Sequence, residues 1–240
     1  MKPKEWDLSG KNALVTVGGD FISNSAISAL EEAGANVCIL NFESHNSQGK
    51  ENIFFTERNS RESLLESLDK IEKRFGNIDI LVNCSQAVLG KPFVDTTDSE
   101  LNFLLDSNIR NTLLVMQEVG KKMLNHQYGR IINVISALSQ IGLKNAVLYS
   151  ATQAAIEQVT KSLSLEWALE NIRINSIAMG WFKDQITDET QKQNLSKYIP
   201  LRRLGESEEI GALLVYLASE FSDFVTGQTI FVDGGAVSHA

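Results

Sequence analysis

The stretch that decides the fold runs Ile131-Ile132-Asn133-Val134-Ile135-Ser136 and is followed, thirteen residues after the serine, by Tyr149-Ser150-Ala151-Thr152-Gln153. The first segment is a short apolar run rich in β-branched residues, which indicates a strand that is buried on both faces. The second segment opens a long stretch with helical spacing of small and apolar residues. The rest of the chain repeats this alternation of strand and helix.

Working outward from that stretch, we expect strands at residues 12–17, 36–40, 53–56, 78–83, 130–135, 173–178 and 229–232. We expect helices at residues 22–33, 64–75, 99–124, 149–171 and 207–219. Strands that are apolar on both faces and separated by amphipathic helices predict a doubly wound, parallel, seven-stranded sheet of the Rossmann type. No linker, repeat or low-complexity tract divides residues 1–240, so we predict one α/β domain. The polar segment 181–200 is interpreted as a lid or substrate loop with a short helix.

Composition excludes several classes of function. The chain has 240 residues, of which 43% are hydrophobic and 22% charged, as expected of one soluble domain with a sizeable core. Thirty acidic residues against 22 basic ones give a net charge of −8, which argues against nucleic acid or an anionic membrane as partner. No apolar run approaches the roughly 20 residues of a membrane span. Residues 1–6 lack an apolar signal core, and a cytoplasmic location is therefore expected.

Cysteines and histidines do not predict a metal site. Cys38 and Cys84 each lie in an apolar strand pattern, which favours two buried free thiols over a disulfide or a metal pair. His45, His126 and His239 are scattered without ligand spacing.

Several motifs stand in order along the whole chain. They are residues 8–11 (LSGK), 79–83 (DILVN), 173–177 (RINSI), 200–205 (PLRRLG), 226–228 (TGQ) and 233–235 (DGG), together with Asn108, the Ser136/Tyr149 pair and Glu209. With these motifs the chain resembles the short-chain dehydrogenases/reductases, in particular the β-oxoacyl reductase-like subgroup. The resemblance implies a Rossmann-like fold and hydride transfer to or from a nicotinamide cofactor.

The resemblance also implies catalytic roles. In the family a tyrosine exchanges a proton with the substrate oxygen, a serine steadies that oxygen, and an asparagine anchors a water relay. Asn108, Ser136 and Tyr149 match these positions. The family's lysine, four residues after the tyrosine, is replaced by Gln153. A neutral amide cannot lower the pKa of Tyr149 from about 10, so we interpret the three residues as a vestigial catalytic set.

The glycine-rich turn of the family, T-G-x-x-x-G-x-G, is altered in the same way. Its three glycine positions carry Val17, Phe21 and Ser23, and the side chain of Phe21 is expected to occupy the pyrophosphate position. Gly18 and Gly19 lie one position out of register and leave a different turn open.

Other nucleotide contacts are also changed. Gln86 replaces a glycine, Met179 precedes Gly180 where the family has proline, and Asp184 replaces a threonine. Strand 36–40 leads into Asn41-Phe42, which offers neither an acid for a ribose diol nor an arginine for a 2′-phosphate; Glu57 is a conservative remnant. We predict that this chain binds no cofactor itself. The remnants of a binding site are Gly18, Gly19, Asn83 and Gly180.

Two alternatives at the catalytic positions stay open. Lys144, in the loop before Tyr149, could supply the missing ammonium group, whereas Lys161 is expected to point away from the site. Ser136 and Tyr149 could also serve only to hydrogen-bond each other and the local backbone.

These observations lead to a hypothesis of function. We expect a catalytically degenerate subunit that scaffolds an active short-chain dehydrogenase of the same fold in a heterotetramer. The resemblance extends to heterotetrameric members with one inactive subunit, such as 2-(hydroxy(phenyl)methyl)succinyl-CoA dehydrogenase, and implies an NAD-linked 3-hydroxyacyl-CoA dehydrogenase complex with NAD in the partner. The segments that correspond to the family's assembly surfaces, 99–124, 149–171 and 226–235, are kept. The alternatives are an autonomous NAD(P)-dependent oxidoreductase with an altered nucleotide loop, and a ligand sensor without hydride transfer.

Overall fold

The chain forms a parallel sheet of seven strands in the order β3-β2-β1-β4-β5-β6-β7. The computed structural model describes residues 6–18, 22–42 and 51–239. The strands are β1 (Asn12–Val17), β2 (Asn36–Asn41), β3 (Ile53–Phe55), β4 (Ile80–Asn83), β5 (Gly129–Ser136), β6 (Ile172–Met179) and β7 (Thr229–Val232). The expected single Rossmann-like α/β domain is confirmed.

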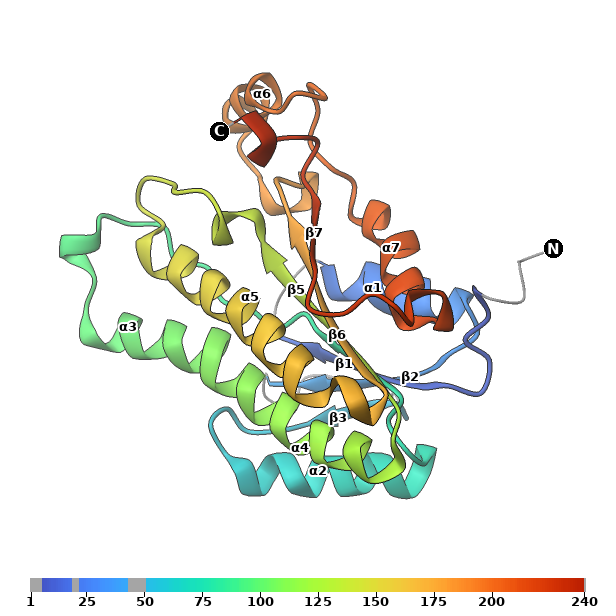
Figure 1. Cartoon of the computed structure of the whole chain (residues 1–240). Helices are drawn as coiled ribbons and strands as arrows, with labels where there is room; N and C mark the ends of the chain where they lie inside the picture. Colours follow the sequence, from blue (N-terminus) through green and yellow to red (C-terminus); the bar gives the residue numbers. More distant parts are fainter. Residues whose placement is uncertain (1–5, 19–21, 43–50, 240) are drawn as a thin grey trace.

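Helices cover both faces of this sheet (Figure 1). They are α1 (Ile22–Glu32), α2 (Arg61–Phe75), α3 (Asp98–Leu105), α4 (Asn111–His126), α5 (Val147–Trp167), α6 (Glu189–Tyr198) and α7 (Gly211–Ala218). Helices α2, α4 and α5 lie on one face, and α1 and α7 lie side by side on the other. Seven of the eight residues of β5 are buried, which explains why its sequence is an uninterrupted apolar run.

The two faces of the sheet form two separate cores. Because successive side chains of a strand point to opposite faces, Leu14 packs against the side of α2, α4 and α5, whereas Val15 packs against α1 and α7. Both are fully buried. The sequence pattern of β1 therefore explains how one strand supplies both hydrophobic layers.

The prediction of one helix over residues 99–124 is wrong in detail. Helix α3 ends at Leu105, a π-helical turn follows at Asp106–Arg110, and α4 continues from Asn111. A π turn inserts one extra residue into the helical ladder and turns the side chains around it, and such turns are frequent at functional sites. Here the turn contains Asn108, one of the expected site residues.

Near the C-terminus the predicted elements are present with shifted boundaries. The helix expected at 207–219 begins as a 3-10 turn, Ser207–Ile210, before α7. The segment 181–200 holds a 3-10 turn at Lys183–Gln185 and helix α6.

None of the helices in the described residues is long and apolar enough to cross a membrane. Cys38 and Cys84 are buried and unbridged, as expected, and burial raises the pKa of Cys38 to about 12.

Candidate active site

A cleft opens where the strand order reverses, at the carboxyl ends of the central strands, which is where open α/β sheets bind their ligands. It encloses a cavity of about 850 Å³. Its walls come from the segment after β1 (Gly18), the segment after β4 (Gln86–Gly90), the end of β5 (Ser136–Leu138), the loop before α5 with Tyr149, and the segment from Met179 to Gln191. The fold therefore brings most of the predicted site residues to one place.

Ser136 and Tyr149 both line this cleft, as their positions in the sequence predict. Ser136 ends β5, and its hydroxyl accepts a hydrogen bond from the Leu138 backbone N–H at 3.2 Å. Tyr149 lies in the first turn of α5, and its hydroxyl donates to Gln86 Oε1 at 2.8 Å. Burial raises the pKa of Tyr149 to about 12, and the Ser136 hydroxyl offsets only part of that effect. The phenol is therefore held in its neutral form.

Gln153 lies one turn after Tyr149 and is only 3% exposed. Its Oε1 accepts a hydrogen bond from the Ser136 backbone N–H at 2.9 Å, and its amide nitrogen lies 3.5 Å from Thr152 Oγ1. The buried Gln153 thus connects α5 to the end of β5 through this hydrogen bond. Gln153 brings no positive charge next to Tyr149, so only the Ser136 hydroxyl opposes the effect of burial on the pKa of the phenol.

The side chain of Asn108 also forms hydrogen bonds within the protein. Its amide donates to the Ala87 carbonyl at 2.8 Å and to Thr152 Oγ1 at 3.0 Å, and its oxygen accepts from the Ala87 N–H at 2.6 Å. The π turn aims the side chain this way, and it ties the segment after β4 to α5. Asn83, in contrast, donates to Asn133 Oδ1 at 2.8 Å inside the sheet.

Comparisons with known proteins match the whole chain. A family described as enoyl-(acyl carrier protein) reductase matches residues 22–237. The 2-dehydro-3-deoxy-D-gluconate 5-dehydrogenase of Bacillus subtilis is 33% identical over 246 residues, covering 97% of each chain. The chain belongs to the short-chain dehydrogenase/reductase family.

Two solved structures of similar proteins have the same fold. A gluconate 5-dehydrogenase from Burkholderia cenocepacia, in complex with NADP and tartrate, is 29% identical with a TM-score of 0.89, covering 98% of each chain. A short-chain dehydrogenase from Leptospira borgpetersenii with bound NAD+ is 26% identical with a TM-score of 0.88, covering 99% of this chain and 96% of that one. The family comprises NAD(P)-dependent oxidoreductases, and the expected whole-chain resemblance is confirmed.

The nucleotide-binding turn of this short-chain dehydrogenase/reductase is described in part. Val17 ends β1, Ser23 is buried in the first turn of α1, and Gly18 lines the cleft. Gly19 and Phe21 lie outside the described residues. The expectation that Phe21 occupies the pyrophosphate position therefore stays a prediction.

On the opposite side of the cleft, Gly180 is required by packing. A Cβ at this position would lie 2.7 Å from the Cα of Asp233. Asp184 also lines the cleft, and its carboxylate accepts a hydrogen bond from the Ser207 hydroxyl. A carboxylate repels a phosphate group at short range, and Asp184 therefore makes this side unfavourable for a pyrophosphate.

The two ends of the cleft differ in the groups that they offer to a nicotinamide cofactor. The inner end keeps Ser136 and Tyr149 but has Gln153 where an ammonium group would hold the ribose. The outer end has a cation that was not predicted from the sequence, because Arg58, in the segment after β3, extends toward Gly18. The signal was present in the sequence, since Arg58 directly follows Glu57, the conservative remnant among the expected nucleotide contacts.

The two lysines considered as substitutes differ in position. Lys161 donates to Glu157 at 2.8 Å, an i,i+4 pair on α5. Lys144 is exposed and lines the cleft, in the loop before Tyr149.

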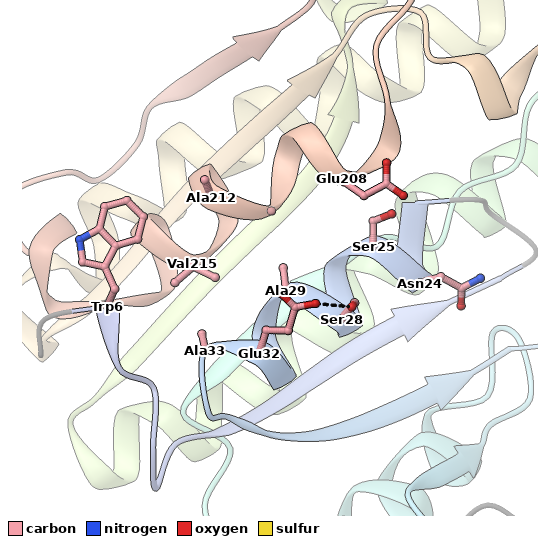
Figure 2. Close-up of a pocket in the computed structure, with 11 residues that line it drawn as sticks. Trp6, Asn24, Ser25, Ser28, Ala29, Glu32, Ala33, Glu208, Ala212 and Val215 are labelled. Carbon is pink, nitrogen blue, oxygen red and sulfur yellow. Dashed lines mark hydrogen bonds between the residues drawn. The ribbon is translucent and has the colours of Figure 1, made fainter. Parts of the chain in front are cut away.

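A second pocket, of about 530 Å³, lies on the far side of the sheet between α1 and α7. Figure 2 shows its apolar part, formed by Trp6, Ala29, Ala33, Ala212 and Val215, with Glu32 and Glu208 at the edge. Ser28 donates to Glu32 at 3.1 Å. The residues that line it include no histidine, cysteine or basic side chain, and we assign no chemistry to it.

Proposed function

We propose that this chain is a catalytically degenerate subunit that assembles with an active short-chain dehydrogenase of the same fold. The observation that carries the proposal is Gln153, buried in the lysine position and hydrogen-bonded to the Ser136 backbone. With a pKa of about 12, only on the order of one Tyr149 in 10⁵ is ionised at pH 7. General acid–base catalysis needs a pKa near the working pH, so Tyr149 is poorly matched to proton transfer.

In the complex, the partner would hold NAD and transfer the hydride, whereas this chain would bind no NAD of its own. A bound nicotinamide accepts or supplies the hydride in this chemistry. The substrate class implied by the resemblance is a 3-hydroxyacyl-CoA. The segment with α6 closes one side of the cleft and would shape the substrate pocket.

Exposed leucines support an assembly through the long helices. Leu165 on α5 is 83% exposed, and Leu169, in the 3-10 turn Ala168–Glu170 that follows α5, is 98% exposed. Leu113 on α4 is also exposed. Large apolar side chains at these positions favour burial against another subunit.

The test is to express the chain alone and together with a short-chain dehydrogenase encoded beside it, then measure mass in solution and NADH formation. We expect a stable complex of both chains, no turnover by this chain alone, and no loss of activity when Tyr149→Phe is made in this chain. The equivalent tyrosine-to-phenylalanine change in the partner is the matched control and should abolish activity. A homotetramer that turns over by itself would contradict the proposal.

An autonomous NAD(P)-dependent oxidoreductase is the second candidate. The cleft of about 850 Å³, lined by both Ser136 and Tyr149, favours it, as does the whole-length similarity to proteins described as dehydrogenases. Titration of the pure chain with NADH and NADPH, followed by nicotinamide fluorescence, separates the two candidates. Micromolar binding with turnover that Tyr149→Phe abolishes would establish the second one.

A further inference from the structure

The hydroxyl of Tyr149 is already hydrogen-bonded to another side chain that lines the cleft. It donates to Gln86 Oε1 at 2.8 Å, and both residues line the cavity of about 850 Å³. Tyr149 lies on α5 and Gln86 in the segment after β4, so the contact joins two walls of the cleft. The acceptor is the carbonyl oxygen of an amide, which has the same planar geometry and lone pairs as the carbonyl oxygen of a ligand.

The phenol of Tyr149 has only one proton to donate. The hydrogen bond with the Ser136 hydroxyl lowers the pKa of Tyr149 against the effect of burial, as expected of a donor to the phenol oxygen. The proton of the phenol itself is directed to Gln86. A ligand oxygen that accepts this proton therefore has to displace the amide.

The backbone next to Gln86 is held by a buried asparagine. Asn108, which is 2% exposed, donates to the Ala87 carbonyl at 2.8 Å and accepts from the Ala87 N–H at 2.6 Å. The same Asn108 amide donates to Thr152 Oγ1 at 3.0 Å, three residues after Tyr149 on α5. Asn108 therefore fixes the position of Gln86 relative to the helix that carries Tyr149.

The segment that carries Gln86, residues 86–91, is also fixed at its other end. The backbone N–H of Lys91 donates to the Asn145 carbonyl at 2.9 Å, in the loop before α5. The Lys91 ammonium group forms an ion pair with Glu100 at 2.9 Å. Because these bonds order the segment without any ligand, the contact between Gln86 and Tyr149 costs little further conformational entropy.

We propose that Gln86 is an internal competitor for the position that a ligand oxygen would take at Tyr149. Its amide carbonyl accepts the phenol proton in the ligand-free protein, and a carbonyl ligand binds there only after the Gln86 side chain has turned away. One neutral hydrogen bond in a protein changes an equilibrium constant by up to about tenfold, so the ligand is weakened by about that factor and is not excluded. The inference goes beyond the proposed subunit role, because it concerns access to Tyr149 and not proton transfer.

The test compares two uncharged probes of similar shape, 4′-fluoroacetophenone and 1-ethyl-4-fluorobenzene, by fluorine NMR titration of the full chain. Only the ketone has an oxygen that can accept a hydrogen bond from Tyr149. We expect Gln86→Ala to tighten the binding of the ketone by up to about tenfold and that of the hydrocarbon by a smaller factor. The measured quantity is the ratio of the two dissociation constants, because both probes gain the same extra space in the variant.

A double-mutant cycle assigns the effect to the phenol. In a Tyr149→Phe background, Gln86→Ala should leave the ratio unchanged, because there is no phenol proton for which the two oxygens compete. Gln86→Asn shortens the side chain by one methylene and keeps the amide, so it is a second variant with a milder change of packing and should show part of the effect. Gln191→Ala is the matched control and should leave the ratio unchanged, since Gln191 lines the same cleft from an exposed position of α6.

Three results would overturn the proposal. An unchanged ratio in both Gln86 variants, or no detectable binding of the ketone by either, would mean that the amide does not compete with a ligand. Equal tightening of both probes would make Gln86 a residue that only fills space. The same change of ratio in the Tyr149→Phe background would separate the effect from the phenol. These measurements need neither turnover nor a partner subunit, so a failure here is distinguishable from a failure of the proposed function.

Discussion

The two ends of the cleft differ in the charge of one buried or half-buried residue. At the inner end, where the family's chemistry needs a cation beside the tyrosine, Gln153 is neutral, buried and hydrogen-bonded to the Ser136 backbone. At the outer end, Arg58 carries a charge that no carboxylate of the described chain balances. The inner end therefore has a neutral, buried group in the lysine position, whereas the outer end has a cation.

This difference separates ligand binding from catalysis, two properties that one cleft usually combines. Binding energy from a remote part of a ligand does not accelerate a reaction unless the groups at the reacting atoms favour the transition state. A charged group far from Tyr149 therefore does not by itself make the chain a catalyst.

The largest effect is expected from Gln153→Lys at the inner end. The change removes the acceptor of the Ser136 N–H and buries an ammonium group in its place, so it should lower the free energy of unfolding by about 2–3 kcal/mol. Urea denaturation would measure this change. We also expect no NADH oxidation by the single variant, because the nucleotide contacts are still altered.

The matched control for this substitution is Gln158→Lys, which makes the same change at an exposed position of the same helix. It should be nearly neutral, because Gln and Lys have similar helix propensities. Measurable NADH oxidation by Gln153→Lys would show that the cofactor is not excluded, and the argument from the nucleotide contacts would then be wrong.

The second prediction concerns the dependence of stability on pH. The pKa of Tyr149 is about 12 in the folded protein and about 10 when unfolded, so the folded state retains the proton more strongly. This contribution to stability is complete below pH 10 and is lost as the pH rises from 10 to 12. The wild type should therefore lose stability relative to Tyr149→Phe over that range, by about 1.4 kcal/mol per pH unit at most.

Urea unfolding at pH 9, 10 and 11 would show the divergence. Tyr198→Phe is the matched control, because it makes the same change at an exposed tyrosine of α6. Parallel pH curves for the wild type and Tyr149→Phe would mean that the phenol is not buried in its neutral form.

A smaller effect is expected at the outer end. Arg58→Gln should cost about 1 kcal/mol or less in the ligand-free protein, because cation–π contacts of half-exposed groups contribute little and the lost hydrogen bond is single. The measurement is the same urea denaturation. A cost as large as that of Gln153→Lys would show that Arg58 is a structural residue, and the contrast between the two ends would disappear.

The fold could be predicted from the sequence because a strand buried on both faces of a sheet is a continuous apolar run. All seven strands were predicted within two residues of their ends, since each is an apolar run bounded by polar residues or glycine. The π turn within residues 99–124 was missed because the apolar periodicity continues through it. The local sequence contains no signal for one extra residue in a helical turn.

At the site, the sequence predicted which residues lie close together but not which atoms form hydrogen bonds. Gln86 was expected as one of the altered nucleotide contacts, and its side-chain oxygen accepts a hydrogen bond from the hydroxyl of Tyr149, which lies 63 residues further along the chain. Arg58 was missed because the direction of a long side chain is set by its tertiary neighbours, here Ser107, Phe42 and Phe103. An arginine was expected only after β2, whereas Arg58 lies in the segment after β3.

The smallest effect is expected from Lys144→Gln, which tests whether an exposed lysine replaces the missing one. Lys144 lines the cleft but is solvated, and the interaction of an exposed ammonium group with a buried phenol is weakened by water and salt. The absorbance titration of tyrosine, taken as the difference between a protein and its Tyr149→Phe variant, reports the midpoint of Tyr149. We expect this midpoint to stay within about 0.2 pH units when Lys144 is changed, since burial and not a neighbouring charge determines it. Lys197→Gln, at an exposed position of α6, is the control for the loss of one surface charge. A rise of the midpoint in Lys144→Gln alone would show that Lys144 stabilises the phenolate, and the inner end would then hold a cation after all.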